Sequence, residues 1–180
     1  CRTRGGRRPP GPPTRNMLIH RIAAQLYTAE ALQTVEAGLD AGEDVTLAVS
    51  QSGRTLMAAA QFARRPRPTV YIVSGEDAAD RAARSLAAYV GLEHVCRFPE
   101  RTDYPWRDKA PDDAVVAQRC EALGRIVRGD KCIMVASARS LLRCVPPVES
   151  RYWASTTFAV GEELPFDEAP QRLVGMGYTK

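Results

Sequence analysis

The stretch VTLAVSQSGRTLMAAAQF, residues 45–62, joins two different patterns at a single glycine. Residues 45–50 form a short apolar run that favours a buried strand, and residues 54–62 are rich in helix-forming types. Between them, residues 51–53 predict a tight loop. A strand, a loop and a helix N-terminus in this order bind phosphate in P-loop proteins, because free backbone N–H groups and the helix dipole point at the anion. The stretch therefore predicts an α/β fold and a candidate phosphate-binding loop.

The candidate loop keeps only half of the P-loop signature, G-x-x-x-x-G-K-[ST]. Gly53 and Thr55 match it, whereas Ala48 replaces the first glycine and Arg54 replaces the lysine. The planar guanidinium of arginine differs in shape from the compact ammonium that reaches between phosphates. We therefore expect a degenerate loop, kept because it joins a strand to its helix, and no catalytic or metal-binding residue. The residues of this degenerate phosphate loop are Ala48, Ser50, Gln51, Ser52, Gly53, Arg54 and Thr55.

Charge and composition place the basic signal outside the folded part. The chain has 180 residues, 44% of them hydrophobic and 26% charged, with a formal net charge of +4. Residues 1–16 contain five arginines and no acid, so the rest of the chain has no net positive charge. This proline- and glycine-rich tail predicts disorder, and we expect the natural start at Met17. No apolar run approaches the ~20 residues of a membrane span, and the folded part offers no electrostatic case for DNA binding.

The cysteines predict reduced thiols in a cytoplasmic protein. The five cysteines are widely spaced and form no C-x-x-C pair, and only two histidines could join them as metal ligands. That set is a poor zinc site and includes no sign of a catalytic cysteine. We expect most of the cysteines to be small core residues.

Helix and strand patterns alternate four times along residues 18–142, which predicts a parallel sheet with helices on both faces. Ser74 is the expected cap of one helix, and Asp112 and Asp113 open another. The second of these helices should bury Val116, Cys120, Leu123 and Val127. After residues 45–50, the expected strands are residues 69–73, 94–98 and 131–136. One or two helices are expected in residues 18–39, and further helices at residues 54–62, 74–91 and 112–129, with a short one at Leu141 and Leu142.

Two further segments give weaker signals. Residues 98–111 hold Tyr104 and Trp106, which could stack on bases, but their acidic neighbours favour packing against the body of the protein. Pro146 and Pro147 end the first domain. Residues 148–180 then predict one strand, one helix and little more, so we expect a second, smaller α+β domain that is cut short.

Several of these features occur together in one known family. The chain resembles the N-terminal end of the bacterial transcription-repair coupling factors (Mfd) from Met17 to Lys180. The residues that carry the resemblance are residues 47–55, Phe98-Pro99, Asp103-Tyr104-Pro105-Trp106, Arg119, residues 133–137, Leu141-Leu142, Pro146-Pro147, residues 160–164 and residues 173–178.

The resemblance implies a fold and a set of partners. The N-terminal region of this family is similar to the repair protein UvrB, whose P-loop is intact, so residues 17–147 would be a UvrB-like domain that has lost ATP. Residues 148–180 would begin the domain that recruits UvrA. RNA polymerase, double-stranded DNA and the ATP and Mg²⁺ of the motor would belong to later regions. The chain itself would hold no cofactor and catalyse no reaction.

Two other functions remain open at this stage. The first is an active P-loop nucleotide-binding domain of a UvrB-like or helicase-like ATPase, which would use Gly53, Arg54 and Thr55. The second is a free-standing α/β interaction protein unrelated to repair.

Overall fold

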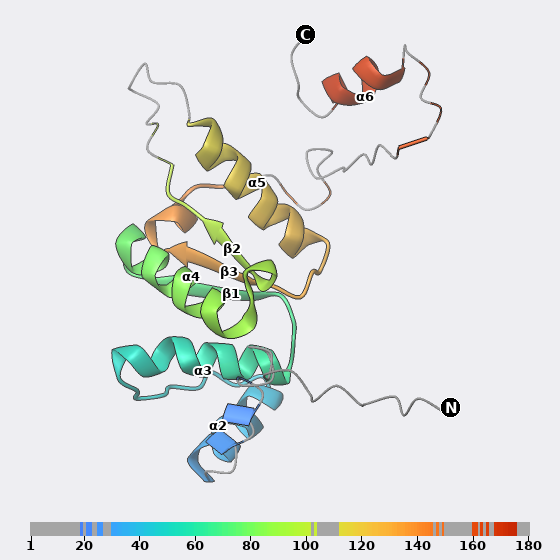
Figure 1. Ribbon diagram of the computed structural model, residues 1–180. Coiled ribbons are helices and arrows are strands. Elements are labelled where there is room, and N and C mark those ends of the chain that lie inside the picture. The colour runs from blue at the N-terminus through green and yellow to red at the C-terminus, as the bar shows by residue number, and fades with distance from the viewer. Residues whose placement is uncertain are drawn as a thin grey trace, which may run out of the picture.

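A three-stranded parallel sheet forms the centre of the structure, a computed structural model of the chain (Figure 1). The strands β1 (Thr69–Val73), β2 (Val95–Phe98) and β3 (Ile133–Ser137) follow the order β1-β3-β2. Thr69 and Val95 both align with Ile133. The structure describes residues 19, 21–22, 25–26, 30–101, 103, 112–145, 147, 149, 160–161, 163, 165 and 168–175.

The α/β class and the parallel sheet predicted from the sequence are confirmed. The expected strand at residues 45–50 is wrong, because this segment has no regular structure and Leu47 is 38% exposed. A strand is stabilised by pairing with a neighbour, and residues 45–50 pair with no strand in the described part of the chain. Apolar, β-branched composition alone therefore did not make a strand here.

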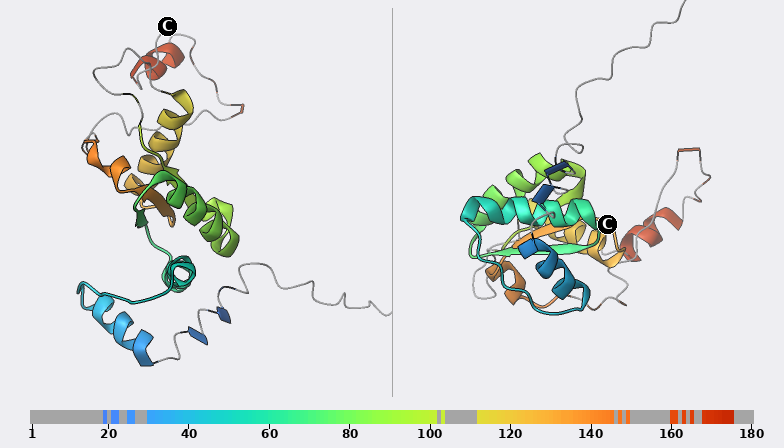
Figure 2. Two further views of the ribbon diagram at one scale, coloured as in Figure 1. Left: turned by 90° about the vertical axis from the view of Figure 1, so that its left-hand side faces the viewer. Right: turned by 90° about the horizontal axis from the view of Figure 1, so that it is seen from below.

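Helices cover both faces of the sheet (Figures 1 and 2). The helices α3 (Gln51–Arg64) and α4 (Glu76–Val90) lie on one side, and α5 (Asp113–Val127) lies on the other. The side chains of β3 alternate between these two layers, since Ile133 and Val135 pack in the cluster of α3 and α4 while Met134 and Ala136 pack with α5. All five residues of β3 are buried. The prediction that residues 131–136 hold the central strand is confirmed.

The strand β1 is covered on one face only. Tyr71 and Val73 pack against the cluster of α3 and α4. Val70 and Ile72 point to the opposite face and are 45% and 55% exposed. The strand expected at residues 69–73 is confirmed, but helices cover only one face of the sheet at this strand, whereas the sequence predicted helices on both faces.

The ends of α4 follow the sequence closely. Gly91 ends the helix with a φ of +100°, a conformation that side chains with a Cβ rarely adopt. The cap at the other end is Gly75, one residue after the predicted Ser74. Glu76 and Asp77 lie in the first turn, where carboxylates interact favourably with the helix dipole.

The buried face of α5 differs from the predicted one. Asp112 caps the helix as expected, with its side chain accepting a hydrogen bond from the N–H of Ala114 at 2.9 Å. However, Cys120 is exposed, and the buried residues are Arg119 and Ala122. Of the other predicted residues, Leu123 packs against the core, and Val116 and Val127 are half-buried. The helix is therefore rotated from the orientation that the apolar spacing predicted, and a charged side chain faces the core.

The remaining elements flank this body. The helix α2 (Glu30–Asp40) packs on α3, where Arg64 pairs with Glu36 and Arg65 with Asp40. Two short 3-10 helices, η1 (Leu92–His94) and η2 (Arg139–Leu142), precede β2 and follow β3. The helix α6 (Glu168–Gly175) lies within the predicted second domain. None of the helices in the described part of the chain has the length and apolar character needed to cross a membrane.

Several predictions fall outside the described residues. They concern the tail of residues 1–16, the aromatic residues Tyr104 and Trp106, most of the strand expected before Val160, and residues 176–180. The boundary expected after Pro147 also remains a prediction, because residues 146, 148 and 150–159 are not described.

Candidate functional site

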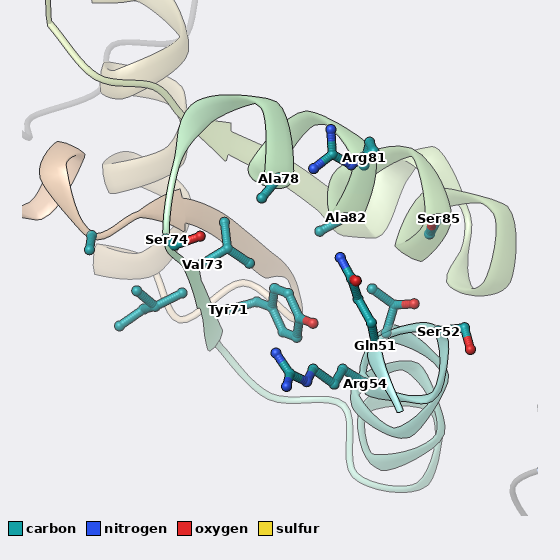
Figure 3. A pocket seen from close by; sticks show the side chains of 13 residues that line it. Gln51, Ser52, Arg54, Tyr71, Val73, Ser74, Ala78, Arg81, Ala82 and Ser85 are labelled. Carbon is teal, nitrogen blue, oxygen red and sulfur yellow. The ribbon is translucent and has the colours of Figure 1, made fainter. Parts of the chain in front are cut away.

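A pocket of about 810 Å³ opens beside β1, between the start of α3 and one face of α4 (Figure 3). It lies at the carboxyl ends of β1 and β3, where ligands bind in open parallel sheets. The lining residues are Gln51, Ser52, Arg54, Thr55, Tyr71, Ile72, Val73, Ser74, Ala78, Arg81, Ala82, Ser85 and Ala138.

The start of α3 is not the loop that the sequence predicted. Residues 51–53 form the first turn of the helix, and Ser50 is its cap. The Ser50 hydroxyl accepts a hydrogen bond from the N–H of Gly53 at 3.3 Å, and the Ser50 carbonyl accepts one from the N–H of Arg54 at 3.2 Å. None of the described residues other than glycine has a positive φ, so Gln51 and Ser52 do not form an inward-turned cradle of amides. A good serine cap extends the helix back over the expected loop.

The seven residues of the degenerate phosphate loop separate into three groups. Ala48 is exposed ahead of the helix, and Ser50 and Gly53 make the cap. A Cβ added to Gly53 would lie 3.3 Å from the Ser50 hydroxyl, so glycine suits this close approach. The four residues that line the pocket are Gln51, Ser52, Arg54 and Thr55.

The pocket is basic. Arg54 and Arg81 line it from two different helices, and no acidic side chain lines it. In the part of the chain that the structure describes, neither arginine forms an ion pair. Burial raises the pKa of Tyr71 above its ordinary value, and the nearby charge of Arg54 partly offsets this rise. Tyr71 therefore keeps its hydroxyl proton at neutral pH and can donate a hydrogen bond.

The residues of the pocket do not fit a magnesium-bound nucleotide held in the P-loop manner. P-loop proteins use a lysine on the phosphates and oxygen ligands that include a carboxylate for Mg²⁺. The lining residues include neither a lysine nor a carboxylate. Elsewhere in the described residues, no group of histidine, cysteine and acidic side chains is placed to hold a metal ion.

A second polar cluster lies at the carboxyl ends of β2 and β3, and the apolar spacing of α5 did not reveal it. Arg119 is only 7% exposed. Its Nη1 donates hydrogen bonds to the carbonyl oxygens of Pro99 at 2.7 Å and Ser140 at 3.2 Å. Its guanidinium carbon lies 3.8 Å from the centre of the Phe98 ring. Burial lowers the pKa of Arg119, with a smaller effect from neighbouring arginines.

Asp103 is held beside this cluster. The Arg101 Nε donates a hydrogen bond to Asp103 Oδ1 at 2.9 Å, and Arg143 donates one to the carbonyl oxygen of Asp103. The side-chain bond from Arg101 is the main cause that lowers the pKa of Asp103 to about 2, and it raises the pKa of Arg101. These contacts fasten the segment after β2 to the end of η2. We call the cluster of Arg101, Asp103, Arg119 and Arg143 the clamp. Its arginines donate hydrogen bonds to oxygen atoms of the protein itself.

The described cysteines divide equally between core and surface. Cys96 and Cys132 are buried, whereas Cys120 and Cys144 are exposed, so the prediction that most of the cysteines are core residues holds for only two of the four described. Burial raises the pKa of the Cys96 thiol to about 12, and the neighbouring Cys132 adds to the rise. A thiol with so high a pKa is a poor nucleophile at neutral pH.

Known proteins similar to the chain share one description. A transcription-repair-coupling factor of Myxococcus xanthus is 32% identical over 118 residues, which cover 62% of the chain and 10% of that protein. Those of Staphylococcus aureus (strain MRSA252) and Mycobacterium bovis are 23% and 32% identical over 132 and 145 residues, which cover 73% and 77% of the chain. The chain is homologous to one region of the transcription-repair coupling factors. The family resemblance inferred from the sequence is confirmed.

The chain spans about a tenth of the length of the coupling factors that it matches. No protein-family model matches it, and no solved structure gives a significant match. The coupling-factor relationship therefore rests on sequence alignments that cover 62–77% of the chain. The description of the basic pocket rests on the structure alone.

Proposed function

We propose that the chain is a non-catalytic module of a transcription-repair coupling factor, which recruits UvrA and regulates the rest of the protein during transcription-coupled nucleotide excision repair. The observation that supports this proposal is the homology to coupling factors over 62–77% of the chain. The sequence resemblance to the UvrB-like N-terminal region of the family supports the assignment to recruitment.

The chemistry of the candidate site agrees with a role other than catalysis. Arg54 stands where a P-loop lysine would be, and the helix begins at Gln51, so the amides do not wrap around a phosphate chain. No carboxylate lines the pocket to hold Mg²⁺. In P-loop proteins, ATP hydrolysis depends on amides that wrap around the phosphates and on a carboxylate that helps to hold Mg²⁺.

In this proposal, the activity of the whole protein comes from regions outside the chain. A motor that uses ATP and Mg²⁺ moves along double-stranded DNA and displaces stalled RNA polymerase. The domain that begins near residue 148 brings UvrA to the exposed lesion. The module formed by residues 17–147 restrains the motor until a partner binds.

UvrA binding and motor activity test this proposal in the longer protein that contains the chain. The comparison is between that protein and a version without residues 17–180. We expect the deletion to abolish UvrA binding in surface plasmon resonance and to raise ATP hydrolysis in the absence of RNA polymerase. Unchanged UvrA binding would refute the recruitment role, and unchanged ATP hydrolysis would refute the regulatory one. Displacement of a stalled polymerase should persist, which shows that the deleted protein is folded.

The alternative is an active P-loop nucleotide-binding domain, and the basic pocket at the start of α3 is the observation that favours it. Titration of ATP with Mg²⁺ by isothermal calorimetry separates the two proposals. A recruitment module should give no binding of magnesium ATP tighter than the millimolar range. A micromolar dissociation constant that the substitution Thr55→Ala abolishes would establish the alternative instead.

A further inference from the structure

We infer that the basic pocket between α3, β1 and α4 binds a phosphate group without a metal ion. This inference goes beyond the recruitment role and does not depend on it. The side chains that carry it are Arg54, Tyr71 and Arg81, which line one pocket from three different elements.

The charge of the pocket selects the sign of the ligand. Arg54 and Arg81 each carry a full positive charge, and no described carboxylate pairs with either of them. Asp77 and Asp80 lie on the same helix as Arg81, but neither lines the pocket. Figure 3 shows Arg54 beside Tyr71 at one end of the hollow and Arg81 on α4 at the other, so the two charges together give the pocket a positive potential that attracts an anion.

The donors of the pocket suit phosphate. The Arg54 guanidinium lies beside the Tyr71 ring, and the Gln51 side chain extends from α3 toward α4 (Figure 3). Arginine presents several N–H groups in one plane, which match the oxygens of a phosphate. The Tyr71 hydroxyl keeps its proton, because burial raises its pKa, and it adds an O–H donor. Thr55, on the same helix turn as Arg54, lines the pocket with a further hydroxyl.

The pocket has room for more than one ion. Small-molecule sites commonly have volumes of roughly 300–1,000 Å³, and this pocket has about 810 Å³. The phosphate can therefore be free in solution or belong to a larger ester. Because no carboxylate lines the pocket, binding should not require Mg²⁺.

The test is an NMR titration of the whole ¹⁵N-labelled chain with inorganic phosphate at constant ionic strength. We expect saturable shifts of the amides in the first turn of α3, with a dissociation constant of about 1 mM. The substitution Arg54→Gln should weaken binding about tenfold, and Tyr71→Phe about threefold. Added Mg²⁺ should leave the affinity unchanged. Shifts that remain linear up to the highest concentration would overturn the inference.

A matched control separates local recognition from general attraction. Arg84 lies on α4 three residues after Arg81, is exposed, and does not line this pocket. We expect Arg81→Gln to weaken phosphate binding a few-fold and Arg84→Gln to leave it unchanged. Equal losses in the two variants would show that phosphate responds only to net charge, which overturns the site. Both arginines are exposed, so the variants should keep the circular dichroism spectrum of the parent chain.

Two further titrations identify the source of the phosphate. If adenosine monophosphate and inorganic phosphate bind with equal affinity, the site recognises the phosphate group alone. Tighter binding of adenosine monophosphate would support a site for a nucleotide. An oligonucleotide with a 5′-phosphate should bind more tightly than the same oligonucleotide without it. Equal binding of the two oligonucleotides would overturn recognition of a phosphate group.

Discussion

Replacement of Arg119 tests how much the buried clamp at the end of the sheet contributes to stability. Alanine at this position removes the donor that serves the carbonyl oxygens of Pro99 and Ser140, and it removes the contact with the Phe98 ring. Arg119 is 7% exposed, so water can enter the vacated space only if the surrounding segments move. The two carbonyls would lose their hydrogen bonds from Arg119.

The expected magnitude follows from these contacts. A hydrogen bond from a charged donor contributes about 1.5–3 kcal/mol, and two of them give roughly 3–6 kcal/mol. Burial of the Arg119 charge costs free energy in the folded protein, and alanine has no such cost. This difference reduces the expected loss of hydrogen-bond energy by several kcal/mol. The lost ring contact and the cavity left by the side chain add to the loss. We expect Arg119→Ala to lower the free energy of unfolding by about 3 kcal/mol, and Arg119→Met, which fills more of the space, by about 2 kcal/mol.

Urea unfolding followed by circular dichroism measures both variants. Gln118→Ala is the control, because Gln118 precedes Arg119 on the same helix and is exposed. We expect this control to change the free energy of unfolding by less than about 0.5 kcal/mol. A loss below about 1 kcal/mol for Arg119→Ala, with an unchanged slope against urea, would refute the reasoning that the clamp stabilises the fold.

Three further predictions concern other parts of the described chain. The pKa of Asp103 is about 2, against an ordinary 3.8. The stability that this carboxylate contributes is therefore present above about pH 4 and is lost as the pH falls through 2. An NMR titration of the carboxyl group should show that the substitution Arg101→Gln raises this pKa. Gly91→Ala should destabilise the chain by about 1–2 kcal/mol because of the positive φ, whereas Gly75→Ala, at a φ of −156° with open space around it, should cost less in thermal unfolding. Cys96, with a pKa of about 12, should stay unmodified by a thiol reagent at neutral pH until urea unfolds the chain, while the exposed thiols react at once.

The elements that the sequence predicted well have strong local signals. Residues 131–136 are apolar and β-rich, and residues 74–91 carry a cap, acidic first-turn residues and a terminal glycine. The structure places β3 and α4 within two residues of these expectations. Local propensity and tertiary packing agree in both segments, so the pattern alone was sufficient.

The errors occur where tertiary contacts outweigh local preference. Residues 45–50 have the composition of a strand but pair with none in the described chain. Apolar spacing placed Cys120 on the buried face of α5. In the structure Arg119 faces inward instead, because it donates hydrogen bonds to two carbonyl oxygens and its guanidinium lies over an aromatic ring. Periodicity treats arginine as a surface residue and does not register such partners.

The candidate site was only partly predictable for a related reason. Residues 51–55 belong to the degenerate P-loop signature in the sequence, and four of these residues line the pocket. Tyr71 and Arg81 lie on other elements, and the fold alone brings them together. No spacing rule connects residues that meet across a strand and two helices.

The position of β3 makes the two layers of the fold depend on each other. Its side chains alternate between the cluster of α3 and α4 and the cluster of α5, and both of its edges are paired with neighbouring strands. Separation of this strand would remove a wall from each cluster at once, so neither layer has a stable partly folded form of its own. The amide hydrogens of β3 should therefore exchange with solvent only when the whole sheet domain opens, while those at the ends of α2 should exchange through small local openings.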